Sequence, residues 1–136
     1  MKSLVLIFIC SIILFSCEKQ DLIEDPPVLS EIIYGDWELR EEMSFLQYRN
    51  EIYNDITLRP YPVYKFFETD SFAVLLNNGT SEERIFFSGP FMINAEDSYI
   101  SLSYAPYKVH GFSKDTLDYR YTGRHGPVGR KLFKID

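Results

Sequence analysis

The amino-acid sequence predicts an all-β domain: a small antiparallel up-and-down barrel of about eight strands, which follows a cleaved signal peptide. Aromatic residues are abundant, with 10 Tyr and 11 Phe among 136 residues. Apolar runs are of strand length, and turn signals recur about every 10 residues. Apolar and polar residues also alternate with a period of two, which is typical of antiparallel strands with one buried and one wetted face. Closing such a meander into a barrel removes both exposed edges.

The first residues have the parts of an export signal. Lys2 supplies a positive charge, and residues 4–15 form an apolar run that contains one hydroxyl residue, Ser11, and no charge. At about 12 residues this run suits a signal-peptide core and is shorter than the roughly 20 residues of a membrane-spanning helix. Strongly polar residues begin at Glu18, so the run is not extended. We therefore expect residues 1–16 to be a signal peptide rather than a buried or spanning helix.

The end of the apolar run resembles the lipobox of bacterial lipoproteins. Leu14-Phe15-Ser16-Cys17 places an apolar, a variable and a small residue before a cysteine. The resemblance implies that the Cys17 thiol takes a diacylglycerol, that the signal is cut before it, and that the new amine is acylated. Several acyl chains, at about 0.8 kcal/mol per buried CH₂, would anchor the protein durably in a membrane of the bacterial envelope, most simply the outer membrane. Because Cys10 leaves with the signal, the mature domain would hold no free thiol and no disulfide.

The mature chain of about 120 residues suits a single domain. Residues 17–30 are expected to be the lipidated cysteine and a flexible tether, since the segment is polar and its Pro26-Pro27 pair favours extended polyproline geometry. Residues 31–136 would form the barrel. The net charge of −6 argues against nucleic acid or an anionic membrane surface as a partner.

Eight strands are expected between the turn signals. Alternation is clear where Trp37 and Leu39 oppose their polar neighbours, and where Ile100, Leu102 and Tyr104 share one face. The expected strands are 36–43, 62–67, 71–76, 83–93, 99–104, 108–112, 116–122 and 130–135.

The breaks between these strands carry turn residues. Asn77-Asn78-Gly79 tolerates the positive φ angles of tight hairpins. Gly89-Pro90, inside one apolar run, indicates a bulge or sharp bend, because proline cannot donate to a central ladder. Residues 123–129 are expected to be a longer glycine-rich loop. Residues 44–59 fit least well, and we consider a long loop, a short helix at Phe45–Tyr53, or a poorly patterned strand.

A set of short motifs along the domain resembles the bacterial lipocalin family. Gly35 and Trp37 form the Gly-x-Trp signature at the start of the first strand. Segments 64–72, 88–93 and 114–117 are similar, in order, to an aromatic hairpin, the following strand and a late strand start of that family. The resemblance implies a barrel with a ligand in its mouth, and a basic residue of the last strand packed on the Trp, for which Arg130 or Lys131 is the expected match.

Residues for catalysis or metal binding are sparse. His110 and His125 are the two histidines and lie apart in sequence, and His110 is expected to be an ordinary residue of the barrel wall. The adjacent pairs Glu41-Glu42 and Glu82-Glu83 would point to opposite faces of their strands and form no paired-carboxylate site. The sequence contains neither a Gly-x-Ser-x-Gly elbow nor a metal-ligand spacing. We therefore expect a protein that is not an enzyme and holds no cofactor or metal.

One basic segment stands out from the acidic background. Its basic residues are Arg120, Arg124, His125, Arg130, Lys131 and Lys134, interspersed with Gly123, Gly126 and Gly129. Backbone amides and guanidinium groups there could hold an anionic group, which makes Arg124, Arg130 and Lys131 candidate ligand-binding residues. The alternative is a hairpin whose charges are spread over two faces by strand alternation.

These observations predict a membrane-anchored envelope lipoprotein that acts as a non-catalytic binding module for a small apolar or amphipathic ligand. The alternative is a filled-barrel interaction protein, such as an accessory subunit or inhibitor of an exported enzyme, without a small-molecule ligand. The aromatic residues suit either a cavity lining or a plain core. An apolar cavity of several hundred Å³ would favour ligand binding.

Overall fold

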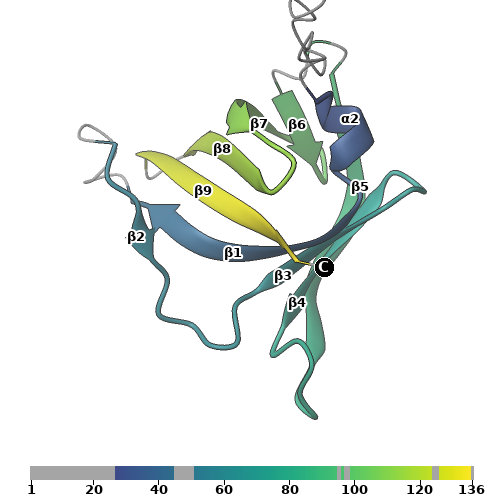
Figure 1. The fold of residues 1–136 in the computed structure, drawn as a ribbon, viewed down its shortest axis with the longest axis vertical. Coiled ribbons are helices and arrows are strands. Elements are labelled where there is room, and N and C mark those ends of the chain that lie inside the picture. Colours follow the sequence, from purple (N-terminus) through teal and green to yellow (C-terminus); the bar gives the residue numbers. More distant parts are fainter. Residues whose placement is uncertain (1–26, 45–50, 95, 97–98, 124–125, 136) are drawn as a thin grey trace, which may run out of the picture.

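Antiparallel strands and one short helix build the computed structural model, which describes residues 27–44, 51–94, 96, 99–123 and 126–135 (Figure 1). The elements are α2 (Leu29–Ile32), β1 (Gly35–Met43), β2 (Asn54–Asp55), β3 (Val63–Phe67), β4 (Ser71–Leu76), β5 (Arg84–Ile93), β6 (Tyr99–Leu102), β7 (Ala105–Phe112), β8 (Thr116–Gly123) and β9 (Gly126–Ile135).

Strand β1 closes the sheet into a barrel because it pairs on both sides. From β3 to β9 each strand pairs with the next along the chain, and β1 pairs with β3 on one side and β9 on the other. β2 pairs only with β1, which leaves eight strands in the ring. Figure 1 shows these strands curving around one interior. The predicted fold class, an antiparallel up-and-down barrel of eight strands, is confirmed, and each predicted strand overlaps an observed one.

Strand β3 pairs with only the first part of β1, from Gly35 to Glu38. Beyond that point the chain between β2 and β3 continues the wall: the Leu39 amide donates to the Pro62 carbonyl (2.9 Å), and the Ile56 amide donates to the Arg40 carbonyl (2.8 Å). Described residues 51–59 thus contain a two-residue strand and a loop, with no helix among them. The helix considered at Phe45–Tyr53 lies partly outside the described residues.

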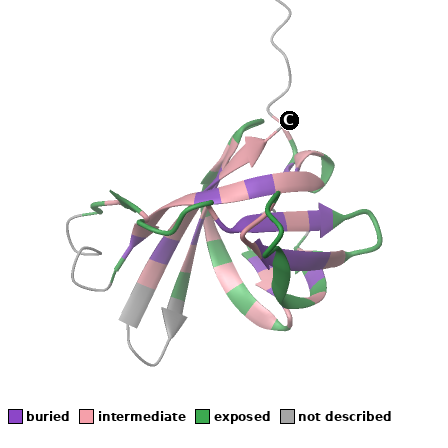
Figure 2. Ribbon diagram, turned by 90° about the horizontal axis from the view of Figure 1, so that it is seen from below, coloured by how far each residue is buried: buried purple, intermediate pink, exposed green. Residues whose placement is uncertain are grey.

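The core lies on the inner side of the barrel wall, and burial alternates along strands such as β1 and β8. Trp37 and Leu39 are buried while Glu38 between them is half-buried, and Leu117 and Tyr119 are buried on β8. Figure 2 shows buried and half-buried bands alternating along the strands. Each large apolar side chain buried in this way contributes about 1.5–3 kcal/mol to the free energy of unfolding. The buried cluster is Leu29, Ile33, Trp37, Leu39, Tyr64, Phe66, Phe72, Val74, Phe91, Ile100, Leu102, Leu117, Tyr119 and Leu132.

Helix α2 brings the chain into one end of this core. Leu29 is fully buried, so the packed part of the chain includes the end of the segment expected to be a tether. The Trp37 ring, also fully buried, donates from Nε1 to the Ile33 carbonyl at 2.7 Å. Gly35 has a φ of +114°, a backbone angle that residues with a side chain rarely adopt. The backbone conformation therefore requires the glycine of the Gly-x-Trp motif.

The basic residue on the Trp37 ring is Lys134. Its Nζ lies 5.3 Å from the ring centroid and donates to the Ile32 carbonyl at 2.8 Å. The expected match, Arg130 or Lys131, is therefore wrong. The reason is the pairing of the closing strands, which places Lys134 directly opposite Trp37, whereas Arg130 faces Glu42 further along β1.

Two expectations at the ends of strands are corrected by the observed pairing. Gly123 pairs with Gly126, so two residues connect β8 to β9 in place of the long glycine loop. Tyr104, expected in a strand, lies in the β6–β7 turn with a φ of 70° and is 81% exposed.

The irregularity of β5 lies at Phe86 rather than at Gly89-Pro90. Val74 pairs with Phe87 and Leu75 with Ile85, which leaves Phe86 as the extra residue, while pairing is regular across Gly89-Pro90. The Pro90 carbonyl accepts from the Ser103 amide at 2.8 Å. In an antiparallel strand, the nitrogen and the carbonyl oxygen of one residue face the same neighbouring strand. The Pro90 nitrogen therefore faces the β6–β7 turn, beyond the end of β6, where strand pairing does not require an N–H donor from β5.

Candidate ligand-binding cavity

A cavity of about 340 Å³ lies within the barrel. Its volume falls at the lower end of the range of small-molecule sites. Seven of the ring strands contribute to its wall, and the apolar part of the lining includes Leu39, Phe72, Val74, Leu76, Phe87 and Leu102. The aromatic residues of this sequence therefore serve in part as cavity lining, one of the two roles expected for them.

The cavity opens between strand β5 and the chain that joins β2 to β3. Leu58 and Phe86 both line the cavity and are 48% and 69% exposed, respectively, so they stand at its mouth. The bulge at Phe86 explains why two consecutive residues of β5, Phe86 and Phe87, both reach the same cavity.

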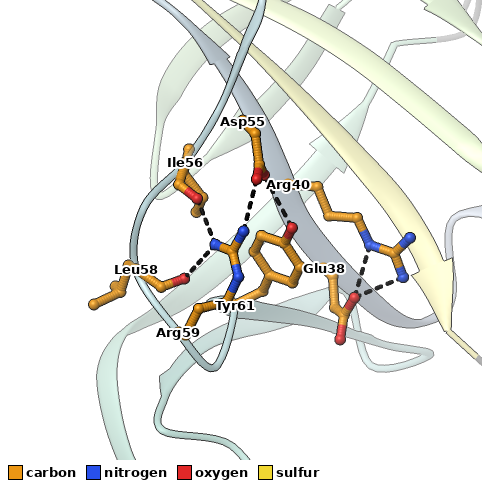
Figure 3. Close-up of polar contacts among 7 residues, drawn as sticks. All are labelled: Glu38, Arg40, Asp55, Ile56, Leu58, Arg59 and Tyr61. Carbon is orange, nitrogen blue, oxygen red and sulfur yellow. Dashed lines mark hydrogen bonds and ion pairs between the residues drawn. The ribbon is translucent and has the colours of Figure 1, made fainter.

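The segment at the mouth is held together by charged and aromatic groups (Figure 3), and Arg40 of β1 lies over its Tyr61 ring, 5.8 Å from the centroid. The Arg59 guanidinium lies over the Tyr61 ring, 3.9 Å from its centroid, and donates to Asp55 (2.6 Å) and to the carbonyls of Ile56 and Leu58. The Tyr61 hydroxyl also donates to Asp55, at 2.9 Å. The contacts fix the backbone around Leu58, which places this side chain in the cavity wall.

Polar groups meet at Arg130 on β9. The guanidinium Nε donates to Glu42 Oε1 at 3.1 Å, and Nη1 donates to the Tyr64 hydroxyl at 3.3 Å. Tyr64, Tyr107 and Arg130 all line the cavity. The wall is therefore apolar with a single guanidinium and two phenol groups, an arrangement typical of sites that orient a ligand by a few polar contacts.

The hydroxyl of Tyr119 lies next to this group. The side chain is 1% exposed and is not part of the cavity lining, its ring packs edge-to-face on Tyr107 (5.2 Å between centroids), and its hydroxyl lies near Tyr64 and Arg130 without the geometry of a regular hydrogen bond. Burial raises the pKa of Tyr119 well above its usual value, and the neighbouring Tyr64 raises it further. The phenol is therefore neutral and able to donate near neutral pH.

Strand alternation separates the candidate basic residues. Arg130 lines the interior, whereas Lys131 is ion-paired with Glu41 (3.1 Å) and lies over the Tyr53 ring (4.3 Å). Arg120 pairs with Glu51 (3.3 Å). Arg124 and His125 lie outside the described residues. The described members of the basic segment thus do not converge on one point, and Arg130 alone among them lines the cavity.

Sequence reasoning missed the tyrosines that surround Arg130. Period-two alternation places Tyr119 on the same face of its strand as Leu117, but it does not say which residue of another strand lies opposite. Tyr64 and Arg130 are 66 residues apart, and β1 separates their strands in the sheet. Such a pair could have been found only from the closure of the barrel.

The remaining chemistry of the described chain is limited. His110 is 44% exposed on β7, with its Nε2 atom 4.0 Å from Glu51, as expected of a wall residue. No group of three His, Cys, Asp or Glu suited to a metal occurs among the described residues.

Two further observations concern the chain as a whole. Within the described ranges, no helix is long and apolar enough to cross a membrane. Comparison with protein-family models, curated proteins and solved structures finds no match to this chain. The cavity and the sequence motifs are therefore the features of this chain that bear on its function.

Proposed function

We propose that this protein is a membrane-anchored, lipocalin-like envelope lipoprotein that binds a small apolar or amphipathic molecule in its barrel without catalysing a reaction. The observation that carries the proposal is the apolar cavity of about 340 Å³. A barrel of about eight strands is wide enough either to be filled by side chains or to hold one small ligand. The cavity supports the second state and weighs against the filled-barrel alternative.

The anchoring part of the proposal depends on the lipobox-like Leu14-Phe15-Ser16-Cys17 segment, which precedes the described residues. Acylation of Cys17 would hold the barrel at the surface of an envelope membrane. Such a position suits a carrier of apolar or amphipathic molecules, because these partition into membranes and need protection from water when they leave them.

A cavity-filling substitution tests ligand binding. Leu76 lines the cavity at the end of β4, and Leu76→Trp should place an indole in the binding space. Met92 is 62% exposed and is not part of the lining, so Met92→Trp is the matched control. We expect the wild-type protein and Met92→Trp to bind the neutral fluorescent probe N-phenylnaphthylamine, and Leu76→Trp to lose this binding.

Native mass spectrometry of the purified wild-type protein provides the second measurement, by detecting a co-purifying small molecule. Probe binding that is equal in the wild type and in Leu76→Trp, or absent from both folded proteins, would contradict the proposal.

A second candidate function is protein interaction, which the exposed residues of β5 favour. Ile85 is 65% exposed, and Phe86 is 69% exposed beside it. Exposed apolar residues that lie together on one strand are typical of contact surfaces. Under this alternative, Ile85→Ser would abolish capture of an envelope protein while leaving probe binding intact.

A further inference from the structure

We infer that two copies of this chain associate through one edge of strand β5, which pairs antiparallel with the same edge of the second copy. The contact is independent of ligand binding in the cavity. It uses a stretch of β5 backbone that no described strand covers.

One side of β5 is paired over only the last part of the strand. β4 pairs with β5 from Arg84 to Pro90, whereas β6, on the other side, pairs only with Phe91–Ile93. No described strand covers residues 84–88 on the side of β6, and we call this stretch the free edge. Figure 1 shows the β4–β5 hairpin extending beyond the ring at the lower edge of the view.

The backbone groups of Ser88 face outward along the free edge. The Pro90 carbonyl accepts from the Ser103 amide, so the backbone of Pro90 faces the side of β6. Alternate residues of a strand face the same neighbour, and pairing with β4 is regular from Phe87 to Pro90. The Ser88 N–H and carbonyl therefore face the same side as those of Pro90, where no described residue pairs with them. An edge of this kind is a template for another strand.

The side chains of the free edge are apolar and exposed. The exposed fractions are 65% for Ile85, 69% for Phe86 and 47% for Phe87. Native sheet edges are commonly protected from pairing by lysine, proline or a bulge. The bulge at Phe86 is the one such device in the free edge, because residues 84–88 include neither lysine nor proline.

A second copy fits this edge because two identical antiparallel edges are complementary to each other. A two-fold axis brings the same residues together from both chains, and each edge is used once, so the assembly closes as a dimer. With the axis at Phe86, the centre of the free edge, Arg84 of each chain lies opposite Ser88 of the other. Arg84 is the one charged residue of the free edge, so no like charges face each other within it.

A lipid bilayer is a poorer occupant of the same surface. Hydrocarbon cannot satisfy the outward N–H and carbonyl groups of the edge. The tip of the β4–β5 hairpin also carries exposed Glu82 and Glu83 directly before the free edge, and burial of these carboxylates in a membrane would be costly.

The exposed side chains supply the area of a weak dimer. Tyr104, which is 81% exposed, lies in the turn next to Ser103 and adds to Ile85, Phe86 and Phe87 at the end of the free edge. Since one aromatic side chain buries about 150–250 Å², two copies would bury on the order of 1,000 Å² in total, the lower limit of specific interfaces. We therefore expect a dissociation constant in the micromolar range.

Sedimentation equilibrium of the purified full-length protein in density-matched detergent micelles tests the dimer. Ile85→Lys places a charge on the free edge and should weaken dimerisation at least about tenfold. Met92→Lys is the matched control, because it adds the same charge at a 62% exposed position of β5 where β6 already pairs. We expect Met92→Lys to dimerise as the wild type does.

Ser88→Pro tests strand pairing separately from side-chain contact, and it keeps the test decisive if Ile85→Lys does not fold. Proline removes the outward N–H of residue 88 and leaves the hydrogen bonds to β4 in place. It should weaken dimerisation, whereas Ser88→Ala, which retains the N–H, should not. Circular dichroism checks that both variants are folded.

Disulfide formation locates the two-fold axis. Residues 18–136 contain no cysteine, so Phe86→Cys supplies a single thiol to the domain. Mild oxidation should link two copies of Phe86→Cys. It should not link Met92→Cys, because the two Met92 positions would lie about 40 Å apart along the paired strands.

Three results would overturn the dimer. The first is a wild-type protein that stays monomeric at all accessible concentrations, which would leave the edge to another protein. The second is dimerisation unchanged by both Ile85→Lys and Ser88→Pro, which would place the interface elsewhere. The third is a monomer that binds phosphatidylcholine vesicles and loses this binding in Ile85→Lys, which would make the bilayer the occupant. Loss of probe binding in the cavity, by contrast, would overturn only the proposed ligand-binding function.

Discussion

The ammonium group of Lys134 lies 5.3 Å from the centroid of the Trp37 ring, and this contact joins the last strand of the barrel to the first. Both side chains also donate to the chain at the end of α2: Lys134 to the Ile32 carbonyl and Trp37 to the Ile33 carbonyl. The closing strand pair and the helix that enters the core are therefore held by the same two residues.

Trp37→Ala should lower the free energy of unfolding by about 3–5 kcal/mol, because it removes a large, fully buried ring. Urea denaturation followed by far-ultraviolet circular dichroism measures this without using the lost fluorophore. In the wild-type protein the Trp37 emission should be blue-shifted and poorly quenched by iodide. Red-shifted, readily quenched emission would show that the ring is exposed and contradict the packing described above.

Lys134→Met should cost about 1 kcal/mol, because it removes a cation–π contact and a hydrogen bond to a backbone carbonyl. Lys108→Met on β7 is the control, because the Lys108 side chain is exposed and should contribute less. Thermal denaturation of both variants makes the comparison. Equal stability of the two variants would show that Lys134 contributes no more than a surface lysine.

Two glycines of the barrel should respond differently to an added methyl group. A Cβ on Gly129 would lie 2.7 Å from Met43 Cε and 2.8 Å from the Tyr53 hydroxyl, which is itself hydrogen-bonded to Asp118. Gly129→Ala should therefore destabilise the protein by about 1–3 kcal/mol. At Gly111 nothing lies within 4 Å of the added Cβ, and Gly111→Ala should be close to neutral. Chemical denaturation of the two variants tests the difference, and similar midpoints would contradict the close approach at Gly129.

Asp55 should titrate below the usual aspartate pKa of about 3.9. Hydrogen bonds from Tyr61 and Arg59 stabilise its charged form and lower its pKa. Because the pKa is lower in the folded state, the contact favours folding above the unfolded value and is lost as pH falls through the folded value. NMR titration of the side-chain carboxyl measures this pKa. Tyr61→Phe should raise it toward the usual value, and an unchanged pKa in that variant would show that the hydroxyl does not act on Asp55.

Lipidation makes a separate prediction at Cys17. The wild-type protein should incorporate labelled palmitate and partition into detergent, whereas Cys17→Ser should accumulate as an unlipidated precursor, because the hydroxyl is a poorer nucleophile than the thiolate. Metabolic labelling with gel electrophoresis measures both properties. A wild-type protein without label would show that the lipobox-like segment is not processed, and would leave the cavity argument unchanged.

The sequence by itself determined the barrel class, the order of its strands and most of their bounds. Each of these depends on local patterns: alternation decides which face of a strand is apolar, and short polar or glycine-containing segments decide where a strand ends. The burial of Trp37 and Leu39 followed from the same alternation and is confirmed. Gly35 was identified by its motif, and its φ of +114° provides the physical reason for the glycine.

Only the tertiary structure decided which inward-facing residues meet. Alternation places Arg130 and Lys134 on one face of β9, but the pairing of β9 with β1 sends Lys134 to Trp37 and Arg130 to Glu42. The bulge at Phe86 and the cavity volume likewise depend on how strands distant in sequence are aligned and closed into a ring. Period-two alternation fits every alignment of two paired strands that keeps their apolar faces inside the barrel. The contacts across the barrel are therefore set by strand register and by closure of the ring, which the local sequence does not encode.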